Sequence, residues 1–366
     1  MGGSIFGNIL QVSTWGESHG SAVGVTVDGI PAGLPVTSSD IQKYLDRRKP
    51  GQSRYTTARK EEDRVEILSG IFEGMTTGTP ISMMVRNADH HSTDYSAIKD
   101  VFRPGHADYT FYRKYGIRDY RGGGRSSGRE TVGRVAAGAV ACRFLNEVGI
   151  SFFTYTKSIG PYEIRKVCRE DMEQNALFMP DADTARMASG YIEEAVQQQD
   201  SVGGVVECVV SNVPAGLGNP VFEKLDANLA KAMLSIGAVK GFEIGDGFLS
   251  SRAKGSSNND AFTIQDNKII KKTNHSGGVL GGISDGDRII FRTAFKPTPS
   301  ISQRQETVNV DKTAQSIAIH GRHDPVIVPR AVVVVEAMAA LVIADALLTN
   351  ALSRMDYIKK LYVDEE

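Results

Sequence analysis

RGGGRSSGRETVGRVAAGAVACR, residues 121–143, joins a glycine-rich loop to an apolar segment with helical spacing. The three glycines at 122–124 have no Cβ, so their backbone N–H groups can come close to a ligand. Ser127 followed three residues later by Glu130 is a capping-box pattern, which predicts a helix that starts near Ser127. A loop that enters a helix N-terminus is a natural anion site, because free N–H groups and the positive end of the helix dipole meet there.

The longest apolar run of the chain is AVVVVEAMAALVIADALL, residues 331–348. Glu336 and Asp345 interrupt this run, which argues against a membrane span. We expect a buried helix here, or a strand that leads into a helix.

The composition is that of a globular chain with a substantial core: of 366 residues, 41% are hydrophobic and 23% are charged. The net charge of −1 excludes the global basic field that holds nucleic acid. Three widely spaced cysteines, in no CxxC pattern, argue against a disulfide framework or a thiolate metal site and suit a reducing compartment. The N-terminus shows no signal-peptide pattern. We therefore expect a cytoplasmic protein without a nucleic-acid or membrane partner.

Strand and helix patterns are mixed along the chain without strict βα alternation, which favours an α+β fold. No composition break looks like a linker, so residues 1–366 are predicted to form a single domain. The expected strands are 5–14, 22–33, 65–74, 79–87, 150–160, 203–214 and 287–295. The expected helices are 37–48 and 228–241, with a peripheral helical region at 161–200. The expected loops are 49–63, 88–110, 245–262 and 296–302.

Arginine is concentrated in two segments, 47–64 and 103–134. Its planar fork makes bidentate hydrogen bonds to carboxylate and phosphate, so these clusters indicate a polyanionic small ligand. The alternative is a pair of solvated basic faces. Lys296, Thr298 and Ser300, on a loop stiffened by two prolines, are further candidates for phosphate binding.

Two histidines in glycine-flanked turns are candidates for proton transfer, His19 in GESHG and His106 in RPGHAD. Asp324 precedes a proline, which holds it in an extended conformation and suits a positioned acid or base. His90-His91 and the HxxH pattern at 320–323 lack a supporting ligand set, so no metal site is predicted.

The sequence does not match two common nucleotide-binding motifs. Gly123 and Gly128 have P-loop spacing, but Arg129-Glu130 follow where Lys and Ser or Thr are required. No GxGxxG follows an N-terminal strand, which excludes a Rossmann fingerprint. The residues alone thus indicate an enzyme or binding protein for a multiply anionic small molecule. An arginine-rich nucleic-acid-binding module that uses residues 47–64 stays open as an alternative.

Seven motifs together resemble the chorismate synthase family in order and over essentially the whole chain. They are GESHGSAVGVTVDGIPAG (16–33), DRRKPGQSRYTTAR (46–59), DYSAIKDVFRPGHADYT (94–110), DYRGGGRSSGRETVGRVAAGA (119–139), HSGGVLGGIS (275–284), KPTPSI (296–301) and GRHDPVIVPRAVVVVEAM (321–338). The resemblance implies a β-α-β sandwich with helices between two outer, largely antiparallel sheets, assembled as a homotetramer. It also implies loss of phosphate from 5-enolpyruvylshikimate 3-phosphate in an anti-1,4-elimination that gives chorismate, the last common step of aromatic amino acid biosynthesis. The resemblance further implies that reduced FMN is required without net redox change, and a flavin-binding regulatory protein without catalysis stays open as an alternative.

The resemblance also implies roles for individual residues. His19 would protonate the departing phosphate, His106 would lie by the flavin ring and hold its protonation state, and Asp324 would assist removal of the C6 proton. The implied substrate-binding residues are Arg48, Arg129 and Arg322, and the implied NADP-binding residues are Arg48 and Arg54. The implied flavin-binding residues are Arg125, Ser126, Ser127, Gly237, Ala238, Gly281, Lys296, Pro297, Thr298, Pro299, Ser300 and Arg322.

Three positions depart from the family pattern. Gly128 stands where alanine is usual, Pro299 where serine is common and Gly237 where asparagine is common. Pro299 removes a hydroxyl and an N–H donor from the flavin loop, and Gly237 removes a side-chain contact. No added flavin-reductase segment is visible, so we expect dependence on an external flavin reductant.

Overall fold

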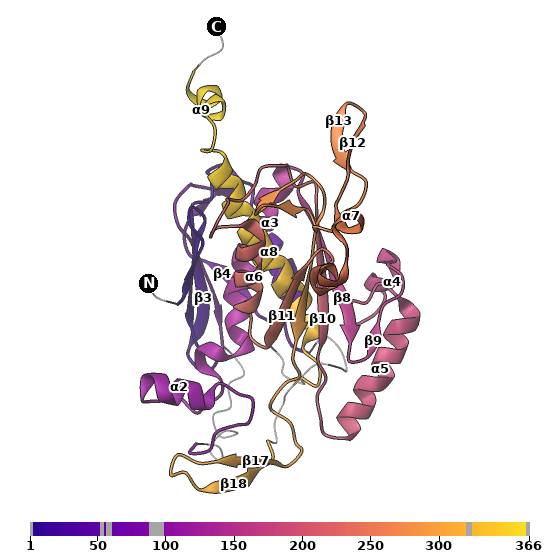
Figure 1. Ribbon diagram of the computed structural model, residues 1–366. Helices are drawn as coiled ribbons and strands as arrows, with labels where there is room; N and C mark the ends of the chain where they lie inside the picture. The colour runs from indigo at the N-terminus through magenta and orange to yellow at the C-terminus, as the bar shows by residue number, and fades with distance from the viewer. Residues whose placement is uncertain (1–2, 52–54, 56–60, 88–98, 320–323, 364–366) are drawn as a thin grey trace.

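The computed structural model describes residues 3–51, 55, 61–87, 99–319 and 324–363. Two five-stranded antiparallel sheets form the outer layers (Figure 1). The first sheet has the order β1-β2-β3-β7-β4, with β1 Ile5–Phe6, β2 Gln11–Gly16, β3 Ala22–Asp28, β7 Ile81–Arg86 and β4 Val65–Ile67. The second has the order β11-β16-β10-β8-β9, with β11 Val239–Ile244, β16 Ile289–Phe295, β10 Gly204–Ser211, β8 Ser151–Ile159 and β9 Tyr162–Glu163.

Helices fill the space between the sheets (Figure 1), so the predicted β-α-β sandwich of the α+β class is confirmed. These helices are α1 Ser38–Arg48, α3 Thr131–Glu147, α6 Leu225–Leu234 and α8 Val328–Asn350. Helix α3 packs on β3 and β2 of the first sheet, α8 packs on β8 and β10 of the second, and the two helices pack on each other. A helix covered on several sides needs apolar residues all round, which is what the sequence of α8 provides.

Helix α8 confirms the buried helix expected from the apolar run at 331–348. It is the one helix among the described residues that is long and apolar enough to cross a membrane, and 78% of its most apolar window is buried inside the protein. Both acidic interruptions have partners. Glu336 accepts two hydrogen bonds from Arg47, at 2.8 and 3.0 Å, and Asp345 accepts the backbone N–H groups of Ile9 and Leu10, at 2.8 and 2.9 Å. Charged groups inside the core are thereby satisfied.

Helices α3 and α8 come close at Gly138 of α3, which faces Ala337 of α8. A Cβ at Gly138 would lie 2.2 Å from the Ala337 Cβ and 2.5 Å from its Cα. Gly138→Ala is therefore expected to destabilise the protein by about 1–3 kcal/mol or more, because backbone must move to relieve the overlap. Urea unfolding measures this loss.

Gly190→Ala is the matched control for this substitution, since Gly190 also lies inside a helix but is exposed, with open space around its missing Cβ. There alanine is expected to stabilise by about 0.5–1 kcal/mol through helix propensity. Equal effects at the two sites would contradict the close packing of α3 on α8.

Several predicted boundaries were wrong. The expected loop at 88–110 runs into helix α2, Asp108–Tyr115, whose C-cap Gly116 is left-handed with φ 75°. The expected helix at 228–241 ends at Leu234, because Ala238 has a left-handed φ of 71° and β11 begins directly after it. The expected loop at 245–262 contains two short helical turns, Gly247–Arg252 and α7 Gly255–Asn258. The peripheral helical region at 161–200 is confirmed as α4 Arg169–Glu173 and α5 Ala182–Gln197.

Small hairpins and a C-terminal helix complete the described structure (Figure 1). The hairpins are β5 Ile71–Phe72 with β6 Met75–Thr76, β12 Phe262–Gln265 with β13 Lys268–Lys271, β14 Val279–Leu280 with β15 Ile283–Ser284, and β17 Gln305–Val308 with β18 Ala314–Ile317. Helix α9 spans Met355–Tyr362. Strand β4 is shorter than the strand predicted at 65–74, and the strand predicted at 5–14 is split into β1 and β2.

Candidate active site

The segment between the glycine loop and α3 is capped at Ser127 as predicted, but its first turn is a 3₁₀ turn instead of an α-helical one. The Ser127 hydroxyl accepts the backbone N–H of Arg129 at 3.3 Å, which caps a 3₁₀ turn at Gly128–Glu130. The regular α-helix starts only at Thr131. Glu130 does not complete the capping box, since its carboxylate accepts hydrogen bonds from Thr14 at 2.9 Å and Arg134 at 2.7 Å. This turn aims the Arg129 side chain inward rather than along a helix surface.

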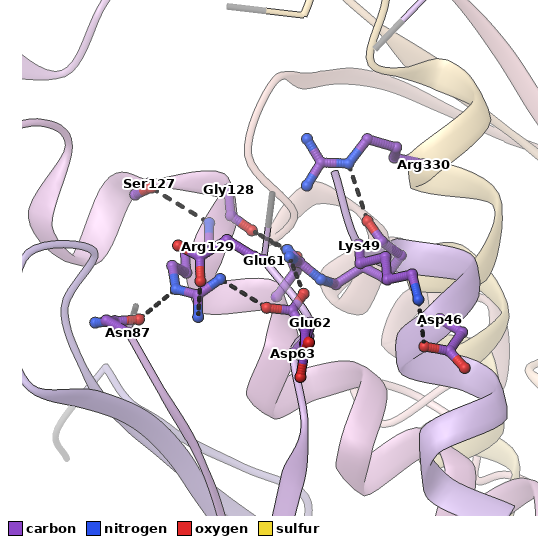
Figure 2. Close-up of polar contacts among 12 residues, drawn as sticks. Asp46, Lys49, Glu61, Glu62, Asp63, Asn87, Ser127, Gly128, Arg129 and Arg330 are labelled. Carbon is purple, nitrogen blue, oxygen red and sulfur yellow. Dashed lines mark hydrogen bonds and ion pairs between the residues drawn. The ribbon is translucent and has the colours of Figure 1, made fainter. Parts of the chain in front are cut away.

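One buried carboxylate holds two of the predicted substrate-binding arginines (Figure 2). The Nη2 of Arg48 donates to Asp63 Oδ2 at 2.7 Å, and the Nη1 of Arg129 donates to Asp63 Oδ1 at 2.8 Å. The Asp63 side chain is fully buried, and the two arginines are 2% and 7% exposed. Arg48 also donates to the Gly128 carbonyl at 3.2 Å, which ties the end of α1 to the turn before α3. Arg48 and Arg129 are therefore buried and paired, and they do not belong to a solvated basic face.

Arg48, Asp63 and Arg129 form a buried trio in which the pKa values of Arg48 and Asp63 each depend on the charges of the other two side chains. Burial lowers the pKa of Arg48 to about 10, although Asp63 opposes that shift, so Arg48 stays charged at neutral pH. Burial by itself raises the pKa of Asp63, but Arg48 and Arg129 outweigh it and hold that pKa below its usual range. Among the described residues the buried Nε of Arg48 has no hydrogen-bond partner. An arginine that retains an unused donor in a buried site suits an anionic ligand.

Two further contacts join this trio to other predicted residues. Asn87 accepts a hydrogen bond from Arg129 Nε (Figure 2). The Asn87 amide also donates to the carbonyls of Glu17 and Gly20, at 2.9 and 2.8 Å, on either side of His19. On the other side Arg330, in the first turn of α8, donates to the Arg48 carbonyl at 2.9 Å and to Asp324 at 2.5 Å. The arginine pair, the His19 turn and Asp324 therefore lie in one connected site.

The two predicted histidines are joined through Gly122. Gly122 has a left-handed φ of 109°, and a Cβ there would lie 2.6 Å from the His19 ring, so only glycine allows this approach. The Gly122 carbonyl accepts from Arg103 at 3.1 Å, and Arg103 is paired with Asp108 at 2.7 Å. Asp108 in turn lies 2.9 Å from His106 Nδ1.

The proline-rich loop lies beside His106. Lys296 Nζ donates to the Gly105 carbonyl at 2.5 Å, and the Lys296 backbone N–H donates to the Ala238 carbonyl at 2.9 Å. Burial, with the nearby charge of Lys240, lowers the pKa of Lys296. The Thr298 hydroxyl is buried and has no hydrogen-bond partner among the described residues. Lys296, one of the predicted flavin-binding residues, thus contacts Gly105, the residue before the histidine that is predicted to face the flavin.

A cavity of about 910 Å³ opens beside the glycine loop and is lined by Arg125 and Ser126. Asp108 and Gly122 also line it, so it borders both histidine turns. Its volume is in the range of cofactor sites. The Arg125 guanidinium donates to the Gly16 carbonyl at 2.9 Å and the Thr14 carbonyl at 3.0 Å, and so holds β2 against the loop.

Some predicted flavin-binding residues are not brought together. Gly281 lies in the β14–β15 turn beside Gly282, whose carbonyl accepts the N–H of Leu225 at the first residue of α6. Ala238 lies past the other end of α6, and a ten-residue helix is about 15 Å long. A Cβ at Gly237 would meet nothing within 4 Å, and the same holds at Gly128. Arg54 and Arg322 lie outside the described residues.

Sequence reasoning missed the acidic partners of the site. Asp63 and Asp108 lie in segments that were predicted to be loops, and Arg330 was noted only as part of the motif at 321–338. The clustered arginines were a usable signal, because buried arginines require nearby carboxylates. No group of three or more His, Cys, Asp or Glu side chains with metal-binding geometry occurs in the described part of the chain, and His90, His91 and residues 320–323 lie outside it.

Comparison with known proteins decides the family. The family model described as chorismate synthase matches residues 10–348. The chain belongs to the chorismate synthase family. It is 62% identical over 364 residues to the chorismate synthase of Agathobacter rectalis, covering 99% of both chains. It is 61% identical to that of Lachnoclostridium phytofermentans, covering 99% of this chain and 100% of the relative.

A solved structure titled as a crystal structure of chorismate synthase supports the same assignment. It has a TM-score of 0.77 and 34% identity, and the match covers 97% of this chain and 96% of the other. As a member of the chorismate synthase family the chain is a lyase. The fold and family predicted from the seven motifs are thereby confirmed.

Proposed function

We propose that this chain converts 5-enolpyruvylshikimate 3-phosphate into chorismate by anti-1,4-elimination. The C6–H bond and the C3–O bond of the substrate break, a new double bond forms in the ring, and inorganic phosphate leaves with the electron pair of the C3–O bond. Family membership over residues 10–348 supports this reaction. The observation that carries it in the structure is the buried pair Arg48 and Arg129, which suits a substrate with two carboxylates and one phosphate.

Each predicted catalytic residue has a place in this proposal. His19, held against Gly122, donates a proton to the phosphate as it departs. Asp324, oriented by its ion pair with Arg330, assists removal of the proton from C6. The arginines bind the anionic groups and keep C3 and C6 between this acid and this base, with Arg322 as the third predicted clamp.

The described residues also fit a flavin phosphate. The Thr298 hydroxyl has no hydrogen-bond partner among the described residues. Together with the Lys296 ammonium, and with Arg125 and Ser126 at the cavity, it supplies donors of the kind that a phosphorylated cofactor needs. Reduced FMN, when bound, supplies an electron-rich ring that stabilises the electron-poor transition state without net redox change. His106, beside this loop, would hold or release a proton at its Nε2.

The finer predictions are part of the same proposal. They describe a cytoplasmic homotetramer that receives reduced flavin from an external reductant. NADP binding was predicted at Arg48 and Arg54. Because Arg48 is buried on Asp63, it has little surface for a second ligand, which favours an external source of reduced flavin.

The test is anaerobic incubation of the purified chain with 5-enolpyruvylshikimate 3-phosphate and chemically reduced FMN. Chorismate and phosphate are expected to appear in equal amounts, and neither is expected with oxidised FMN alone. A lack of chorismate under the reducing condition would overturn the proposal. When NADPH and oxidised FMN replace the reductant, we expect no product, since the chain depends on reduced flavin made elsewhere.

A further inference from the structure

The turn that presents His106 is built from the sequence RPGH. Pro104 stands at the second turn position and Gly105 at the third, with a φ of 68°, and the backbone N–H of His106 donates to the Arg103 carbonyl at 3.2 Å. This is the type II pattern, in which proline presets one φ and glycine tolerates the positive one. The turn fixes the backbone of His106 but leaves its ring free to rotate.

Asp108 supplies the contact that orients this ring. It is the first residue of α2 and is 3% exposed. Its Oδ2 accepts the backbone N–H of Arg103 at 3.1 Å and the Arg103 Nε at 2.7 Å. Its Oδ1 accepts Arg103 Nη2 at 2.8 Å and lies 2.9 Å from His106 Nδ1. Arg118 approaches Oδ2 to 3.1 Å.

The charge of Asp108 decides which nitrogen of His106 carries the proton. Burial by itself raises the pKa of Asp108, but hydrogen bonds from Arg103 and His106 outweigh it and hold that pKa far below its usual range. Asp108 is thus a carboxylate throughout the working pH range, and a carboxylate only accepts hydrogen bonds. A neutral His106 must therefore place its proton on Nδ1, which leaves a lone pair on Nε2.

We infer that Asp108 is the positioning residue of His106, which locks the Nδ1–H tautomer and presents Nε2 to the ligand beside the 296–300 loop. The same carboxylate anchors Arg103, which donates to the Gly122 carbonyl against His19. Asp108 therefore sets the geometry of both histidine turns. The expected effect of Asp108 on turnover rests on the proposed function. The expected tautomer of His106 does not, because it follows from the contact with Asp108 alone.

The first test reads the tautomer in the unmodified protein. Long-range ¹H–¹⁵N correlation spectra resolve the two ring nitrogens of each of the seven histidines, and the His106→Gln variant assigns the His106 signals. We expect a neutral His106 protonated on Nδ1. A neutral ring protonated on Nε2 would overturn the inference, and this result requires no variant of Asp108.

The second test uses Asp108→Asn, because asparagine keeps the shape but can donate as well as accept. We expect a mixture of His106 tautomers and a fall in kcat of roughly tenfold or more, with KM changed much less. Asp183→Asn, an exposed acid on α5 paired with Arg186, is the control and is expected to match the unmodified protein. An unchanged tautomer and unchanged kcat in Asp108→Asn would contradict the inference. If the unmodified chain itself makes no chorismate, the proposed function fails, but the tautomer result still decides the role of Asp108.

Discussion

Asp324→Asn is expected to lower kcat by a factor of about 10² to 10⁴, the usual contribution of a positioned general base. In the unmodified protein Arg330 donates to Asp324 at 2.5 Å. Asparagine has the same shape as aspartate and can still accept this hydrogen bond, but it cannot take up a proton. The Asp324 side chain is 11% exposed and precedes a proline, so its position is set by the backbone and by Arg330 rather than by its charge alone.

Flavin binding separates this effect from a general loss of structure. FMN affinity, measured by fluorescence quenching, is expected to change little in Asp324→Asn while chorismate formation collapses. Asp356→Asn is the matched control, since Asp356 also pairs with an arginine, Arg354 at 2.7 Å, but lies on the exposed helix α9. Full activity of Asp324→Asn would show that Asp324 is not the base. The same pattern of lost turnover with retained flavin also rules out a regulatory protein without catalysis.

The second large effect concerns stability. Asp63→Asn is expected to reduce the free energy of unfolding by about 3–5 kcal/mol, because it leaves Arg48 and Arg129 buried without their shared counter-charge. The backbone of Asp63 has a positive φ of 47°, a conformation that asparagine tolerates well, so backbone strain adds little. Urea unfolding at pH 7 measures the loss.

The pH dependence of this loss has a defined sign. The arginines hold the pKa of Asp63 below its unfolded value of about 3.9, so its stabilisation is fully present above pH 4 and is lost as pH falls toward the folded pKa. The difference in stability between the unmodified protein and Asp63→Asn should therefore be largest at neutral pH and shrink below about pH 4.

A surface pair provides the control for Asp63. Glu66 accepts a hydrogen bond from Arg86 at 2.8 Å, and the side chains of Arg86 and Glu66 are 70% and 41% exposed. Glu66→Gln is expected to cost at most about 1 kcal/mol. If Asp63→Asn were no more costly than Glu66→Gln, the buried trio would not stabilise the site.

Local sequence patterns predicted much of the fold because their causes are local. The glycine loop at 122–124, the cap at Ser127 and the apolar spacing of α3 and α8 each depend on residues a few positions apart. Where a local signal was weak, the prediction failed. Helix α2 is short and polar, and the turn after α6 depends on a left-handed Ala238, which no propensity predicts.

The candidate site shows the same division between local and distant causes. The histidines in glycine-flanked turns and the clustered arginines were visible as residue types, and the motif resemblance named their roles. Their partners were not visible. Arg48 meets Asp63 across 15 positions, and Arg129 meets the same carboxylate across 66. Arg330 reaches back 282 positions to the carbonyl of Arg48.

By itself, the sequence determined the family and the two buried helices, and it predicted an anion site in the loop of residues 121–131. Only the tertiary structure decided how the charges there are balanced. Burial makes an unpaired arginine costly, so each buried guanidinium requires a carboxylate, but which carboxylate arrives depends on how α1, α3 and α8 pack between the sheets. That packing placed Asp63 between two arginines and Asp108 between an arginine pair and His106.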